Sequence, residues 1–75
     1  MWKEINNSLV KEFKFDNFQA AFAFMTRVAF LSEAQNHHPT LINTYSNVKI
    51  ELNTHDAGNT ITDKDRRLAS AIDLI

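Results

Sequence analysis

The three histidines of this 75-residue sequence fall in two short stretches that could carry out acid–base chemistry. His37 and His38 are adjacent, with Glu33 before them and Pro39 directly after them, and His55 lies beyond a predicted hairpin. The unperturbed pKa of histidine, about 6.5, allows it to donate and accept protons near neutral pH. General acid–base catalysis is one interpretation of this cluster. The other is structural, because histidines at the C-terminal end of a helix complement the negative end of its dipole.

The same residues do not form a typical metal or nucleophile site. Adjacent histidines need not point in the same direction, whereas a zinc site normally has regular ligand spacing and further thiolates or carboxylates. The sequence contains no cysteine, and no serine lies in a recognisable nucleophile elbow beside a histidine. We therefore expect no metal ion and no covalent intermediate at this site.

Glu33, Asp65 and Trp2 could assist the histidines, and each has a structural alternative. Glu33 precedes His37 by one helical turn, at the i,i+4 spacing at which helix side chains touch. We expect its carboxylate to orient the His37 imidazole; the alternative is an ordinary surface ion pair. Asp65 is either a site carboxylate or a capping residue of the last helix. Trp2 either stacks on a flat ligand or packs in the core.

The hydrophobic pattern predicts two strands, a helix, two strands and a final helix. The predicted elements are two strands within residues 2–15 around a turn at Asn6–Asn7, a helix at 17–36 capped by Asp16, strands at 41–45 and 48–52 around Ser46–Asn47, and a helix after Thr62. A polar loop, residues 54–60, carries His55. This ββαββα order is typical of an α+β domain with two layers, in which a four-stranded antiparallel sheet carries its helices on one face.

The two predicted helices differ in how much apolar surface they carry. Residues 18–31 are apolar on nearly every side, with only three polar interruptions. A helix on the outside of a two-layer domain needs one apolar stripe, so a second face of this helix requires cover from another helix or another subunit. In the last helix we expect one buried stripe, formed by Leu68, Ile72 and Ile75.

Composition and charge limit the class of protein. Residues 1–75 are expected to form one domain, and a chain of this length buries only about 60% of its unfolded surface, which favours self-association. The net charge of -1 and the scattered lysines and arginines give no basic surface for nucleic acid. We find no N-terminal signal region and no apolar segment long enough to span a membrane. Together with the absence of cysteine, these features predict a cytoplasmic protein.

Taken in order, these residues resemble the pterin-4a-carbinolamine dehydratase family. The run Glu33–Pro39 reads Glu-x-x-x-His-His-Pro, and it is followed by Tyr45, His55 and an acidic residue after a glycine-containing loop. The resemblance extends over essentially the whole chain. Further matching positions are Trp2, Phe13–Asp16 with Phe18, Phe24-Met25 with Val28-Ala29, Thr54–Asp56 and Leu68-Ala69.

The resemblance implies a fold, an activity and a mode of association. Members of the family have a four-stranded antiparallel sheet with helices on one face, and they form dimers and tetramers by extending the sheet and pairing the long helices. They dehydrate a 4a-hydroxytetrahydropterin to the quinonoid dihydropterin, which recycles the pterin after an aromatic amino acid hydroxylase has used it. No metal or organic cofactor is implied, because the pterin nitrogens supply the electrons that expel water.

The resemblance also implies roles for individual residues. It places His38 and His55 beside the reacting edge of the pterin as acid and base, and His37 against the hydroxyl group or the ring. The residues expected to bind or enclose the substrate are Glu33, Pro39, Thr54, Asp56, Asp65 and Trp2.

Two features depart from the family pattern. Family members usually carry a helix before the tryptophan, and this sequence begins almost at Trp2, so we expect a short form without that helix. The loop at residues 56–61 is one residue longer than the common form, which leaves the match between Asp65 and the family's acidic residue open.

The alternative to an enzyme is a binding module, in which the same fold serves as an assembly factor or interaction partner, since fold alone does not settle function. The histidines distinguish the two hypotheses, because a pure scaffold has no reason to keep the whole set. All three are present, which favours the enzyme.

Overall fold

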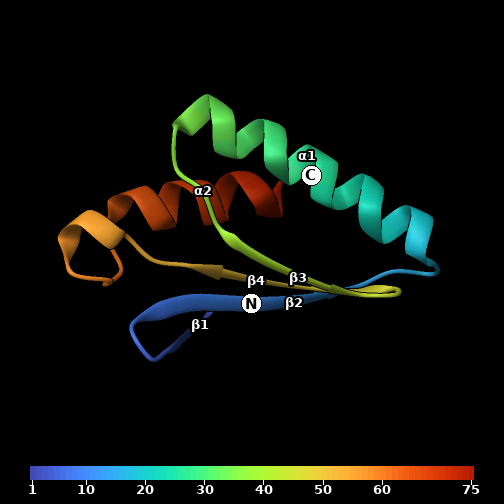
Figure 1. The fold of residues 1–75 in the computed structure, drawn as a ribbon, viewed down its shortest axis with the longest axis horizontal. Helices are drawn as coiled ribbons and strands as arrows, with labels where there is room; N and C mark the ends of the chain where they lie inside the picture. The colour runs from blue at the N-terminus through green and yellow to red at the C-terminus, as the bar shows by residue number, and fades with distance from the viewer.

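The computed structural model describes residues 1–75, which form four strands and two α-helices. The elements are β1 (Lys3–Ile5), β2 (Ser8–Lys14), α1 (Phe18–Gln35), β3 (Thr40–Thr44), β4 (Asn47–Leu52), the short 3-10 helix η1 (His55–Ala57) and α2 (Asp63–Asp73). Both α-helices lie on the same face of the sheet, which gives the domain two layers (Figure 1). The predicted α+β class and ββαββα order are confirmed.

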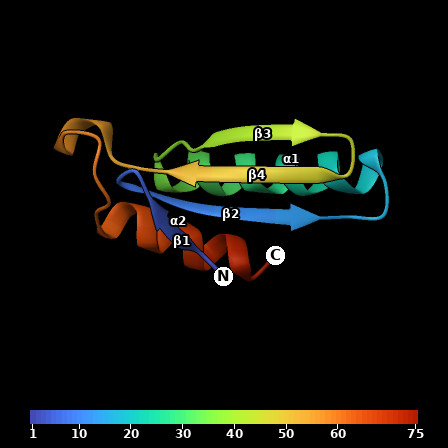
Figure 2. The same cartoon turned by 90° about the horizontal axis from the view of Figure 1, so that it is seen from below.

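The sheet is antiparallel throughout, with the strand order β1-β2-β4-β3 (Figure 2). β2 and β4 form its centre, where Leu9 lies opposite Leu52 and Phe13 lies opposite Val48. The strict alternation in β4 puts Val48, Ile50 and Leu52 on the face that the helices cover, and all three are fully buried. This face of the sheet carries the core of the domain.

The two hairpin turns depend on residues that accept a positive φ. Asn6 and Asn7 have φ values of 51° and 63°, as expected for a tight turn between twisted strands. The second turn lies at Tyr45 and Ser46, one residue before the predicted position. Tyr45 has a φ of 50°, an uncommon conformation for a bulky residue, and the side chain of Asn43 donates a hydrogen bond to its carbonyl (3.1 Å). Residue type alone did not indicate this turn.

Helix α1 begins one residue later than predicted, because its N-cap is Asn17 and not Asp16. The Asn17 side-chain oxygen accepts a hydrogen bond from the amide of Ala20 (2.8 Å). Asparagine and aspartate are about equally good N-caps, so the sequence does not decide between two such neighbours.

The apolar surface of α1 is divided between a buried stripe and an open face. The buried stripe consists of Ala21, Phe24, Val28 and Ser32. On the other side Phe18, Phe22 and Phe30 are 47%, 52% and 73% exposed. The chain itself therefore leaves open the second apolar face that the sequence predicted to need cover. No helix in the structure combines the length and apolar character that crossing a membrane requires.

Helix α2 has the single buried stripe that the sequence predicted, with one exception. Leu68 and Ile72 are buried, whereas Ile75 is 42% exposed. The prediction for Ile75 is wrong because the helix ends at Asp73, so the residue that follows at i+3 no longer lies on the helical face.

Candidate active site

The end of α1 and the beginnings of η1 and α2 lie at one end of the domain (Figure 1). A polar cleft is formed by residues from this end. Its volume is about 290 Å³, and its lining contains no hydrophobic residue. The lining residues are Asn36, His37, His38, Asn53, Thr54, His55, Asp56 and Lys64. The fold therefore brings all three histidines to one cleft, which we call the histidine cleft.

His37 reaches this cleft because α1 stops just before it. Asn36 adopts the left-handed conformation (φ 50°, ψ 45°) at the C-cap, where asparagine is tolerated better than most residues. The reversal is closed by a hydrogen bond from the His37 amide to the carbonyl of Ser32 (3.0 Å). His37 thus leaves the surface of α1 and turns toward α2.

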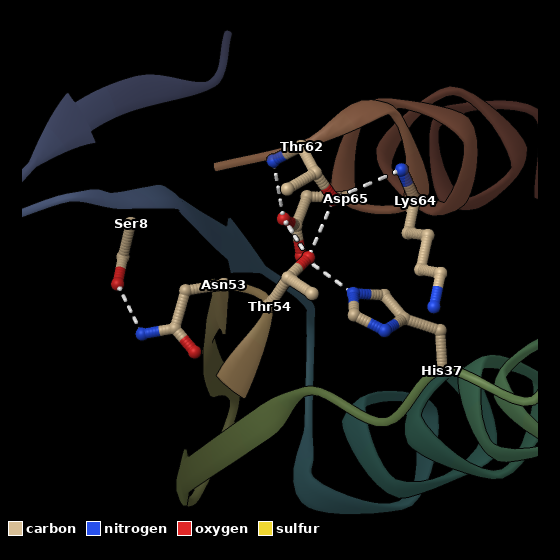
Figure 3. A network of polar contacts seen from close by, with 7 residues as sticks. All are labelled: Ser8, His37, Asn53, Thr54, Thr62, Lys64 and Asp65. Atoms are coloured by element: carbon tan, nitrogen blue, oxygen red, sulfur yellow. Dashed lines mark hydrogen bonds and ion pairs between the residues drawn. The ribbon is translucent and has the colours of Figure 1, made fainter. Parts of the chain in front are cut away.

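The imidazole of His37 binds Asp65, in the first turn of α2, rather than Glu33. Its Nε2 lies 2.5 Å from Oδ1 of Asp65, and the aspartate side chain is fully buried. Figure 3 shows the His37 imidazole linked to Asp65 by a dashed line, with Thr54 and Thr62 also bonded to the carboxylate. Because an ionised carboxylate only accepts hydrogen bonds, Nε2 of His37 carries the hydrogen.

Asp65 combines the two roles that the sequence left open. Its Oδ2 accepts a hydrogen bond from the amide of Thr62 (2.8 Å) and completes the capping box of α2, while its Oδ1 binds His37. Burial raises the pKa of the Asp65 carboxyl, but hydrogen bonds from His37, the Thr62 amide and the Thr54 hydroxyl outweigh it. The pKa of Asp65 therefore lies below its usual range, and the carboxylate is ionised at neutral pH.

Glu33 binds His38, so the predicted contact between Glu33 and His37 is wrong. His38 Nε2 lies 2.5 Å from Oε2 of Glu33, and both side chains are exposed. The i,i+4 rule applies only while the helix continues, and the left-handed Asn36 moves His37 off the helix face that carries Glu33.

His55 occupies the third side of the cleft, at the start of η1. Its Nδ1 lies 3.0 Å from the side-chain oxygen of Asn59. Gly58, with a φ of 81°, turns the loop, and its amide donates to the carbonyl of His55 (3.1 Å). The loop thus folds back on itself and holds the exposed imidazole at the mouth of the cleft.

The other predicted site residues divide into those in the cleft and those outside it. Thr54 and Asp56 line the cleft, and the half-buried Pro39 follows His38 without lining it. Trp2 lies at the other end of α2, where its indole Nε1 donates to Asp73 (3.1 Å) and its ring packs edge-on against Phe13. The structure does not bring Trp2 to the histidine cleft.

Sequence reasoning missed three of the lining residues and the role of one further residue. Asn36, Asn53 and Lys64 line the cleft, and the hydroxyl of Thr62 lies 2.6 Å from the hydroxyl of Thr54. Each of the three lining residues is adjacent to a residue that the sequence singled out for the site, whereas Thr62 was identified only as the residue before the last helix. Their neighbours therefore carried a signal, but only the fold shows that these side chains share one space.

Each histidine in the cleft has one ring nitrogen bound by an oxygen of the chain. The oxygen belongs to Asp65 for His37, to Glu33 for His38 and to Asn59 for His55. A neutral imidazole that donates from one nitrogen accepts at the other, and a protonated one donates from both. The second nitrogen of each ring is therefore available to accept a proton from a bound molecule or to donate one. In contrast, no three side chains of His, Cys, Asp or Glu converge as metal ligands would.

Three comparisons relate the chain to known proteins. Residues 1–75 match the sequence model of the family described as Pterin 4 alpha carbinolamine dehydratase. A protein of Prochlorococcus marinus, provisionally named pterin-4-alpha-carbinolamine dehydratase, is 54% identical over 99% of this chain and 76% of its own length. A relative from Chloroflexus aurantiacus with the same provisional name is 51% identical, over 99% of this chain and 78% of its own.

Two solved structures share the fold. A transcriptional coactivator/pterin dehydratase from Brucella melitensis superposes with a TM-score of 0.90 at 32% identity, over 97% of this chain and 79% of its own. A pterin dehydratase-like protein identified as a RuBisCO assembly factor in the alpha-carboxysome has a TM-score of 0.81 at 26% identity, over 97% of this chain and 86% of its own. Because the family model matches residues 1–75 and a relative is 54% identical over 99% of the chain, the chain belongs to the pterin-4-alpha-carbinolamine dehydratase family.

Proposed function

We propose that this protein dehydrates a 4a-hydroxytetrahydropterin to the quinonoid dihydropterin and water. The observation that carries the proposal is the histidine cleft, where three imidazoles each keep one ring nitrogen free in a chain of this family. The entirely polar lining suits a heterocycle rich in nitrogen and oxygen. Its volume of about 290 Å³ is just below the roughly 300–1,000 Å³ typical of small-molecule sites.

The proposed reaction moves two protons and needs two histidines in different states. The bond between C4a and its hydroxyl oxygen breaks, and a protonated imidazole supplies the proton that turns the leaving hydroxyl into water. A neutral imidazole accepts the proton from N5, so protons balance over the reaction. We assign these two roles to His38 and His55, through Nδ1 of His38 and Nε2 of His55.

His37 has a different part in the proposal, because it is the most firmly held of the three. Its imidazole is mostly buried and bound to the ionised Asp65. We assign its free Nδ1 to the hydroxyl group or ring of the substrate, where a fixed donor or acceptor orients the reacting edge. Thr54, Asp56 and Pro39 would shape the pocket around the ring, and Glu33 would orient His38 rather than His37.

A spectroscopic dehydration assay with a synthetic pterin carbinolamine tests this function. We expect the purified protein to accelerate dehydration well above the spontaneous rate, and the His38→Ala/His55→Ala double variant to lose the acceleration while it remains folded. A wild-type protein that leaves the spontaneous rate unchanged would exclude the proposed activity. In the cell, the activity would serve an aromatic amino acid hydroxylase that releases the carbinolamine.

We also propose that the protein self-associates, as a dimer or tetramer, through the open face of α1. Phe18, Phe22 and Phe30 are large apolar side chains that a monomer leaves 47–73% exposed. Replacing Phe22 with Asp should dissociate the oligomer in sedimentation experiments, whereas Thr26→Ala, a small change on the same helix, should leave it assembled. A wild-type protein that sediments as a stable monomer at micromolar concentration would contradict self-association.

The second candidate function is a non-catalytic assembly factor. One solved relative, the pterin dehydratase-like protein of the alpha-carboxysome, is described as a RuBisCO assembly factor, and the open apolar face of α1 offers a surface for a partner protein. The dehydration assay separates the two functions, since an assembly factor needs neither turnover nor the histidines.

A further inference from the structure

Two threonine hydroxyl groups lie next to Asp65: that of Thr54, which lines the histidine cleft, and that of Thr62, at the start of α2. Thr54 Oγ1 lies 2.8 Å from Oδ2 of Asp65 and 2.6 Å from Oγ1 of Thr62. Thr54 and Asp65 are both buried. Figure 3 shows the hydroxyl of Thr54 joined by dashed lines both to the carboxylate of Asp65 and to the hydroxyl of Thr62.

The hydrogen bonds in this group can run in only one direction. The ionised Asp65 carboxylate accepts but cannot donate, so the hydrogen of the Thr54 hydroxyl points at Oδ2. Thr54 has no second hydrogen, and therefore the Thr62 hydroxyl donates to Thr54. Thr62 in turn accepts from the amide of Lys64 (3.3 Å) at the start of α2. The chain thus runs from the α2 backbone through both hydroxyls to the carboxylate that holds His37.

The backbone of Thr54 holds the loop of His55 at the same time. Its amide donates to the carbonyl of Thr60 (2.8 Å), and its carbonyl accepts from the amides of Ala57 (3.2 Å) and Asn59 (3.1 Å). Asn59 is also the side-chain partner of His55. One residue therefore connects the support of His37 with the support of His55.

We propose that Thr54 and Thr62 are positioning residues, whose hydroxyl chain fixes the orientation of His37 and its placement relative to His55. Neither hydroxyl needs to touch the substrate for this role. The expected effect on kcat rests on the proposed dehydratase function, because it arises only if His37 and His55 act on the reacting edge of the pterin. The orientation of His37 itself does not depend on that function.

The pairs of variants Thr54→Val with Thr54→Ser, and Thr62→Val with Thr62→Ser, isolate the hydroxyl group. Valine keeps nearly the shape of threonine but cannot donate, whereas serine keeps the hydroxyl. We expect each Val variant to lower kcat by about 10- to 100-fold, since misplacement by about 1 Å can cost this much, and to change KM less. Each Ser variant should stay within about threefold of wild type. The Thr54→Val/Thr62→Val double variant should lose less than the product of the single losses, because both act through one chain.

Asn17→Ala is the matched control for stability. Asn17 is the N-cap of α1, and its side chain accepts a hydrogen bond from the amide of Ala20. Asn17→Ala therefore removes the N-cap of α1, just as Thr62→Val removes the N-cap of α2. Thermal unfolding should show a comparable loss of stability in both variants, but kcat of Asn17→Ala should equal that of wild type. Equal losses of kcat in the two variants would reduce the role of Thr62 to helix stability and overturn the proposal.

Nitrogen NMR of the His37 ring provides a measurement that does not require turnover. In the neutral His37 ring of the wild-type protein we expect Nε2 to carry the hydrogen and Nδ1 to be unprotonated. In Thr54→Val and Thr62→Val the two ring nitrogens should shift toward values averaged between tautomers. Wild-type signals for His37 in both folded Val variants would overturn the inference. A wild-type protein without dehydratase activity but with these shifts would reject the proposed function and retain the positioning role.

Discussion

Two histidine–carboxylate pairs border the histidine cleft, and in each of them the nitrogen and oxygen lie 2.5 Å apart. In the pair of His37 and Asp65 the side chains are 11% and 0% exposed. In the pair of His38 and Glu33 they are 57% and 78% exposed. The first pair joins the segment after α1 to the start of α2, whereas the second joins that same segment to the last turn of α1.

The comparison shows that burial, not distance, decides what such a pair does. An exposed ion pair typically contributes only about 0.2–1 kcal/mol, because water and salt screen it and two side chains lose freedom. Breaking a buried, hydrogen-bonded pair by removing one partner typically costs about 3–5 kcal/mol. We therefore expect the buried pair to fix the geometry of the cleft, while the exposed pair leaves His38 free to adapt to a substrate.

The largest effects should come from removing the histidines themselves. His38→Ala and His55→Ala should each lower kcat by about 10²–10⁴-fold, the usual contribution of a general acid or base. The double variant should cost less than the product of the single effects, because the two groups act as a unit. His37→Ala should act at least partly by raising KM. Near-wild-type kcat in both His38→Ala and His55→Ala, with circular dichroism showing intact folds, would leave the assembly-factor function as the better explanation.

Replacing Asp65 should affect stability and kcat far more than replacing Glu33, although both carboxylates lie 2.5 Å from their histidines. Asp65→Asn removes an ionised acceptor of three hydrogen bonds, and we expect it to lower the free energy of unfolding by about 2 kcal/mol or more and to lower kcat markedly. Glu33→Gln should change stability by less than about 1 kcal/mol and kcat only slightly. Urea unfolding and the dehydration assay measure both quantities. Similar losses in the two variants would contradict the distinction by burial.

Acid should weaken the buried pair in a predictable direction. The pKa of Asp65 is lowered in the folded state, so its ionisation stabilises the fold above the unfolded pKa of about 3.9, and this contribution is lost as pH falls through the folded pKa. The difference in unfolding free energy between wild type and Asp65→Asn should therefore shrink when the pH is lowered from about 5 to about 2. Glu33→Gln leaves the Asp65 contacts intact and serves as the control, which should follow the wild-type pH dependence.

Salt should affect only the exposed pair. The Debye length falls to about 3 Å at 1 M salt, which screens exposed charges much more than buried ones. The small stability difference between wild type and Glu33→Gln should disappear at about 1 M NaCl, while that of Asp65→Asn should persist. Urea titrations at low and high salt provide the measurement, and a salt-sensitive Asp65 effect would show that water reaches this pair.

The smallest expected effect is that of a chelator. Each histidine already has one ring nitrogen bound to an oxygen of the chain, and no set of three potential ligands converges. Exhaustive treatment with EDTA should therefore leave kcat of the wild-type protein unchanged. A large loss that zinc or iron restores would replace the acid–base assignment by a metal-dependent one.

Local patterns in the sequence were sufficient for most of the fold. The alternation along Val48, Ile50 and Leu52 predicted the buried face of β4, because side chains in a strand point to alternate sides. Thr62, with acidic residues in the turn that follows it, predicted the start of α2 from equally local geometry. The errors, at Asp16, at the second turn and at Ile75, are shifts of one or two residues at the ends of elements, where several residue types are acceptable.

The sequence by itself determined which residues can do chemistry, since only histidine titrates near neutral pH and the chain concentrates its histidines in two stretches. It could not determine which carboxylate holds which imidazole. That choice depends on Asn36, whose left-handed conformation ends α1 before His37 and directs the ring toward a residue 28 positions further along the chain. Contacts between distant segments form only when the helices pack on the sheet, and the same packing buries them and so makes them contribute to stability. The tertiary structure alone therefore decided that the carboxylate pair of His37 is buried and that of His38 is exposed.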